Sequence, residues 1–139
     1  MSMNDPYAKY FTNQVLTASP SKLLIMSYDA AIRFSSIALE RMKANNVEEK
    51  GLYIGKVQDL ILNLSSALDP KVDQQLVANL EALYTFMFDS LTHANFRDDQ
   101  KVLANVIKML TEMRETWAEA DKMNKTGQSS AANMTRRAA

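Results

Sequence analysis

The chain has 139 residues with 16 basic and 16 acidic side chains, so its formal charge is zero. This length fits one domain, and 47% hydrophobic residues are typical of a globular chain rather than a disordered one. Neutrality argues against nucleic acid and acidic membrane surfaces as partners. The absence of cysteine excludes disulfide, thiolate and iron–sulfur chemistry, and the single histidine, His93, leaves little for a metal site.

Few residues interrupt helical structure, since the chain holds only three glycines and three prolines. No stretch approaches the roughly 20 apolar residues that cross a bilayer. The N-terminus has no apolar run behind a positive cluster, as a secretory signal would. We therefore expect long helices and a protein of the cytoplasm.

The first two predicted helices each begin at a capping residue. Ser19 precedes a proline that suits the first helical position, which predicts a helix over residues 20–43. Asn46 with Glu49 resembles a capping box and predicts a helix over residues 47–68.

The remainder of the chain predicts two further helices and a tail. An Asp-Pro pair ends the second helix, and a third is expected over residues 72–95. Asp98 is the expected cap of a fourth helix over residues 99–123. The small, polar residues 124–139 predict a disordered tail.

Apolar residues recur every three or four positions, as on the buried stripes of bundled helices. The expected core positions are Ile54, Val57, Ile61, Leu64 and Leu68 in the second helix, Leu76, Leu80, Leu83, Met87 and Leu91 in the third, and Leu103, Val106, Leu110, Met113, Trp117 and Ala120 in the fourth. Helices of matched length with short connections predict an all-α fold, an antiparallel up-down four-helix bundle over residues 19–123. Residues 1–18 are expected to form an N-terminal lid segment.

The helices carry more apolar surface than one buried stripe each requires. Phe86, for example, lies well round its helix from the core positions. Such a surplus is consistent with wide buried stripes, with a dimer interface, or with a groove that holds a partner peptide. The apolar side chains of the N-terminal segment can fold back on the same surface. The nine methionines suit ordinary core filling and also a surface that adapts to a partner.

Motifs for catalysis are missing from the sequence. There is no phosphate-binding loop, zinc-protease motif or serine-hydrolase motif. His93 has no second histidine for a di-iron bundle, and a haem held by Met and His is the remaining cofactor alternative. Asp29 precedes Arg33 by four residues, which predicts an ordinary helical ion pair. We predict a non-enzymatic protein with no metal and no cofactor.

A series of short strings follows a specific order between residues 5 and 122. The strings are Pro6-Tyr7, Ala18-Ser19-Pro20 with Leu23-Leu24 and Met26, Tyr28-Asp29-Ala30-Ala31-Ile32, Leu68-Asp69, Asn79-Leu80 with Leu83-Tyr84 and Met87, Ala94-Asn95 with Asp98-Asp99, and Trp117. In order and spacing they resemble the flagellin-specific export chaperones, the FliS family. Ala30 stands where that family usually has glycine, and Asp89-Ser90 where it has a basic pair, which exchanges positive for negative charge on the third helix.

The resemblance implies a chaperone of the bacterial cytosol. It would bind the disordered C-terminal segment of flagellin, prevent premature polymerisation and deliver flagellin to the flagellar type III export gate. In the family, flagellin wraps round the bundle partly as helix and the chaperone's N-terminal segment is displaced or remodelled. Some members also contact the anti-sigma factor of flagellar gene control. We expect a monomer or weak homodimer, and the alternative is a dimeric structural or adaptor bundle with a different protein client.

The predicted flagellin-binding residues combine this resemblance with the surplus apolar positions. They are Tyr7, Tyr10, Val15 and Leu16 in the N-terminal segment and Tyr53, Val57, Leu60, Tyr84, Phe86 and Asn95 in the groove. Asp29 and Trp117 are interpreted as structural residues, and Trp117 is expected in the core.

Overall fold

The computed structural model describes Lys9, Asn13 and residues 18–138, with side chains described as far as Asn124. Every regular element in this part of the chain is helical, which confirms the predicted all-α fold. The labelled helices are α2 (Pro20–Lys43), α3 (Val47–Ser66), α4 (Gln74–Arg97) and α5 (Gln100–Ala138).

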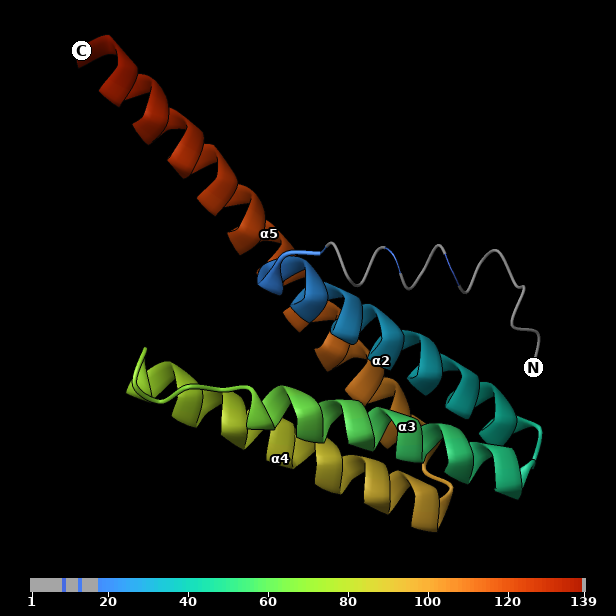
Figure 1. Ribbon diagram of the computed structural model, residues 1–139. Coiled ribbons are helices and arrows are strands. Elements are labelled where there is room, and N and C mark those ends of the chain that lie inside the picture. Colours follow the sequence, from blue (N-terminus) through green and yellow to red (C-terminus); the bar gives the residue numbers. More distant parts are fainter. Residues whose placement is uncertain (1–8, 10–12, 14–17, 139) are drawn as a thin grey trace.

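The four helices form an antiparallel bundle in which each packs against two others (Figure 1). Helix α2 contacts α3 and α5, and α4 contacts the same two helices. The surface at the α2–α3 junction therefore faces away from the surface at the α4–α5 junction. The end of the bundle that holds the α3–α4 connection diverges from the start of α2 and from α5 (Figure 1).

Polar side chains cap the helix starts as the sequence predicts. The Ser19 hydroxyl accepts a hydrogen bond from the backbone N–H of Lys22 at 3.2 Å, ahead of α2. The Asn46 amide oxygen accepts from the N–H of Glu49 at 3.2 Å, ahead of α3. Each bond satisfies one of the donors that a helix start leaves unpaired.

The connection between α4 and α5 differs from the prediction by one residue. Asp98, the expected cap of the last helix, instead ends α4 in the left-handed conformation with φ of 52°. The neighbouring Asp99 takes the capping role, because its carboxylate accepts from the N–H of Val102 at 3.1 Å. Asp is one of the few residues that tolerate the left-handed conformation of Asp98. The Asp98 carboxylate accepts a hydrogen bond from the buried ammonium of Lys50 at 2.6 Å.

The core follows most of the predicted positions. The four predicted positions within α3 are buried, as are the first three in α5, while Leu68 lies beyond the end of α3. Met113 and Trp117 are only half-buried, and Ala120 is exposed rather than in the core. Leu76 and Leu83 differ, because 44% and 39% of their surfaces remain exposed. The divergence of α4 from α5 leaves these two leucines beside a groove rather than in a closed interior.

Helix α5 is longer than the sequence predicts. Its backbone continues as one helix to Ala138, past the expected end near Met123, and projects beyond the bundle (Figure 1). A single glycine, Gly127, costs only about 1 kcal/mol relative to alanine and does not by itself end a helix. The boundary between a bundle of residues 19–123 and a disordered tail of residues 124–139 stays a prediction.

Candidate functional site

An apolar groove separates the first half of α4 from the middle of α5. Its volume is about 430 Å³. The groove is lined by Leu76, Leu80 and Leu83 from α4 and by Met109, Glu112, Met113, Thr116, Trp117 and Ala120 from α5. Leucine and methionine side chains dominate its walls, and methionine adapts its shape readily to a partner. We call this feature the α4–α5 groove.

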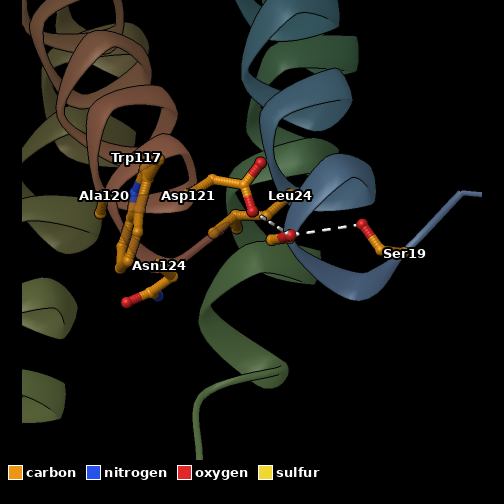
Figure 2. A pocket seen from close by; sticks show the side chains of 7 residues that line it. Ser19, Leu24, Trp117, Ala120, Asp121 and Asn124 are labelled. Carbon is orange, nitrogen blue, oxygen red and sulfur yellow. Dashed lines mark hydrogen bonds between the residues drawn. The ribbon is translucent and has the colours of Figure 1, made fainter. Parts of the chain in front are cut away.

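A second pocket of about 400 Å³ adjoins the groove at the start of α2. Trp117 and Ala120 line both cavities, so the indole ring stands between them. Figure 2 shows Trp117, Asp121 and Asn124 of α5 facing Leu24 and Ser19 from the beginning of α2. The pocket lies at the first residues of α2, next in sequence to the segment that is expected to form a lid.

A hydrogen bond ties the two helices together at this pocket. The Ser21 hydroxyl donates to the Asp121 carboxylate at 2.7 Å, and Ser19 and Ser21 hydroxyls lie 3.3 Å apart (Figure 2). The start of α2 is thereby fixed against α5 beside the pocket.

Below the groove, the core contains a pair of tyrosines from non-adjacent helices. The hydroxyls of Tyr28 on α2 and Tyr84 on α4 lie 2.6 Å apart, and both residues are buried. Burial raises the pKa of Tyr28, and the Tyr84 hydroxyl and the Trp117 side chain oppose that rise. Burial, followed by the hydrogen bond to Tyr28, raises the pKa of Tyr84. Both phenols are therefore neutral, and Trp117 connects them to the groove.

The structure places the predicted groove residues in three different environments. Val57 and Tyr84 are 0% and 2% exposed, so they belong to the core rather than to an open groove. Tyr53 and Leu60 are half-buried on α3 and pack against the core. Phe86 is 53% exposed, as expected for a residue away from the core positions.

Asn95 and Tyr84 have specific neighbours that explain their positions. The Asn95 side chain lies close to Gly51 of α3, where a Cβ atom would meet both amide atoms at 3.9 Å. The backbone carbonyl of Asn95 accepts a hydrogen bond from the Lys50 ammonium at 2.9 Å. Tyr84 also lines a small cleft of about 160 Å³ between α3 and α4, together with Leu62 and Phe88. The predicted groove set is thus spread over several surfaces. Tyr7, Tyr10, Val15 and Leu16 lie outside the described residues.

The residues of the α4–α5 groove were only partly apparent from the sequence. Leu76, Leu83, Met113 and Trp117 share the periodicity of core residues, so periodicity alone assigns them to the interior. Trp117 is in fact half-buried and packs against the edge of the core. The surplus of apolar side chains was the signal that some of these stripes remain uncovered.

The ion pairs also differ from the helical pairing that the sequence predicts. Asp29 pairs with Arg114 of α5 at 2.9 Å rather than with Arg33. The pKa of Arg114 is raised chiefly by its hydrogen bond to Asp29. Because α5 packs against α2, this contact between helices replaces the contact within α2. His93 is an exposed surface residue 3.5 Å from Asp99.

No group of three or more His, Cys, Asp or Glu side chains in the described part of the chain is arranged to hold a metal ion. None of its helices combines the length and apolar character needed to cross a membrane.

Comparison with known proteins gives consistent matches over most of the chain. A family model described as flagellar protein FliS matches residues 3–124. The flagellar secretion chaperone FliS of Bacillus subtilis (strain 168) is 31% identical over 120 residues, which are 86% of this chain and 89% of that protein. The flagellar secretion chaperone FliS of Vibrio cholerae is 32% identical over 105 residues, or 76% of this chain and 77% of that protein.

A solved structure supports the fold independently. It is described as the crystal structure of a flagellar chaperone from bacteria, and it matches with a TM-score of 0.71. The match covers 84% of this chain and 98% of the other at 16% identity, which shows a shared fold.

Proposed function

This chain belongs to the FliS family of flagellar secretion chaperones, and on that premise we propose that it binds the disordered C-terminal segment of flagellin. Binding would prevent premature polymerisation in the bacterial cytoplasm, and the chaperone would then deliver flagellin to the flagellar type III export gate. The role is stoichiometric masking rather than catalysis, and it uses no cofactor.

The α4–α5 groove is the observation that carries this proposal. A disordered segment that folds on binding forfeits at least about 2–5 kcal/mol of the gross interaction energy in ordering. Burial of apolar surface offsets that loss at about 25 cal/mol per Å², so the receptor must offer an apolar surface that its own core does not use. Leu76, Leu83 and Met113 supply such a surface along the groove, which is the kind of apolar surface that receives the apolar face of an amphipathic helix.

The N-terminal segment is proposed as a removable cover for the same region. The pocket between Leu24 and Trp117 begins where that segment joins α2. Tyr7, Tyr10, Val15 and Leu16 would occupy this pocket or the groove in the free protein and move when flagellin binds. The export-gate contact and an anti-sigma-factor contact remain predictions from the family alone.

Titration calorimetry with a flagellin C-terminal peptide from the same organism tests the proposal. We expect saturable one-to-one binding, a negative heat-capacity change and a gain of helix. Trp117 is the only tryptophan, so its fluorescence should shift to shorter wavelength as the groove is desolvated. Absence of heat and of helix gain at tens of micromolar would contradict the proposal, and a stable dimer by light scattering would then favour the adaptor alternative.

Matched variants locate the binding surface. Leu83→Asp and Phe86→Asp place a charge on α4 at side chains that are already partly exposed, so the fold should persist. Leu52→Asp makes the same kind of change at an exposed leucine on α3, outside the groove. We expect Leu83→Asp to weaken peptide binding at least about tenfold, because a carboxylate in an apolar contact loses its hydration. Equal affinities for Leu83→Asp and Leu52→Asp would place flagellin elsewhere.

A further inference from the structure

Two cationic side chains contact a pair of aromatic rings at the α2–α3 junction. The rings of Phe34 on α2 and Tyr53 on α3 have centroids 6.0 Å apart. The Arg33 guanidinium and the Lys56 ammonium each lie 5.3 Å from the Phe34 centroid, and Lys56 also lies 5.8 Å from that of Tyr53. We call these four residues the cation–aromatic surface.

The charges of this surface lack acidic partners within the described chain. Arg33 and Lys56 are exposed, and neither forms an ion pair with another described residue. Asp29, one turn before Arg33, is already held by Arg114 at 2.9 Å. Two like charges near one ring repel each other, and carboxylates that pair with them would offset that repulsion. The cation–π contacts meanwhile hold both side chains in place.

The half-buried rings add an apolar component to the same surface. Phe34 and Tyr53 pack against the core on one side and are partly exposed on the other. Aromatic residues and arginine are the side chains most enriched at the energetic centres of protein interfaces. The combination suits a ligand that carries both carboxylates and apolar groups.

The cation–aromatic surface faces away from the α4–α5 groove. Its residues come from α2 and α3, whereas the groove is lined entirely by α4 and α5. A segment bound in the groove would therefore leave Arg33 and Lys56 accessible.

We infer that the cation–aromatic surface docks an acidic segment of a second protein, with carboxylates pairing with Arg33 and Lys56 and apolar side chains contacting Phe34 and Tyr53. Charge complementarity identifies the occupant, because the cations are the unpaired element of the surface. Nucleic acid is disfavoured, since phosphate backbones are bound by long basic stripes and this chain has no net charge. The inference stands whether or not the groove binds flagellin.

Calorimetry on the full chain with a capped peptide of Glu-Glu-Leu-Glu repeats tests the inference. We expect measurable binding that weakens when salt rises from about 0.05 to about 0.5 M, because exposed charges are screened. The double variant Arg33→Glu/Lys56→Glu should bind the peptide at least about tenfold more weakly. The matched control Lys101→Glu/Lys108→Glu, which makes the same charge change at exposed residues of α5, should bind as the natural chain does.

Several results would overturn the inference. Equal affinity in the Arg33→Glu/Lys56→Glu variant, with its helicity intact, would show that the two cations only stack on the rings. Undiminished binding of a peptide with glutamine in place of every glutamate would remove the charge requirement. Failure of the acidic peptide to bind the natural chain would reject the site. Tighter binding of single-stranded DNA, lost in the same variant, would assign the surface to nucleic acid instead.

Discussion

The tyrosine pair in the core makes a quantitative prediction about stability. Tyr28 and Tyr84 are 0% and 2% exposed, and their hydroxyls are 2.6 Å apart. Removal of one hydroxyl leaves the other buried without that partner, which costs about 1–3 kcal/mol. Tyr28 retains the neighbouring Trp117 side chain, whereas Tyr84 has no other hydrogen-bond partner among the described residues. We therefore expect about 1 kcal/mol of destabilisation for Tyr84→Phe and about 2 kcal/mol for Tyr28→Phe.

Urea unfolding followed by circular dichroism measures these values. The double variant Tyr28→Phe/Tyr84→Phe should cost clearly less than the two single changes added together, because it removes donor and acceptor at once. Tyr53→Phe is a matched control, since that ring is half-buried and its hydroxyl forms no hydrogen bond with another described residue. Additivity of the two core changes within about 0.5 kcal/mol would refute the coupling.

Two further predictions concern buried polar groups. Lys50→Ala leaves the Asn95 carbonyl without its ammonium donor and should cost about 2 kcal/mol in the free energy of unfolding, against almost nothing for the exposed Lys101→Ala. The pKa values of Tyr28 and Tyr84 are raised above the ordinary 10.0 in the folded protein, so folding favours the neutral phenols and stability falls as pH rises above 10. As pH rises above 10, the urea midpoint should fall less steeply for the Tyr28→Phe/Tyr84→Phe variant than for the natural chain. Equal pH dependence of the two midpoints would contradict the raised pKa values of the two tyrosines.

The sequence predicts local features well because they depend on few residues. Ser19 and Asn46 cap their helices as expected, since a cap needs only a short polar side chain and the donor two or three positions away. The core positions Ile54, Ile61 and Leu110 follow from helical periodicity in the same way. These predictions succeed because the interactions that decide them join residues within one or two turns of the same helix.

Contacts between helices escape the same reasoning. The Asp29–Arg114 pair joins residues far apart in the chain, and nothing within α2 distinguishes it from the expected Asp29–Arg33 pair. Val57 and Tyr84 were predicted to line a groove but are buried in the core. The sequence shows that the helices carry more apolar surface than one buried face each requires, but it does not show which of these faces another helix covers. That choice depends on how far α4 diverges from α5, which is a property of the whole bundle.

Two leucines of the α4–α5 groove can separate its structural role from its binding role. Leu80 is 7% exposed and belongs to the core, whereas Leu76, one turn earlier on the same helix, is 44% exposed. Leu80→Ala should cost about 2–4 kcal/mol in stability, as buried leucine truncations do. Leu76→Ala should cost no more than about 1 kcal/mol, because nearly half of the Leu76 surface stays in contact with water in the folded chain.

The affinity for the flagellin peptide should depend on Leu76 although the stability of the free chain hardly does. Leu76 keeps its contact surface for a partner, so Leu76→Ala should weaken binding several-fold while hardly changing the urea midpoint of the free chain. A large loss of stability for Leu76→Ala would mean that this leucine is covered in solution, by residues 1–18 or by a second copy. A loss of peptide affinity without a loss of stability would instead show that Leu76 stays exposed in the free protein and is buried only when a partner binds.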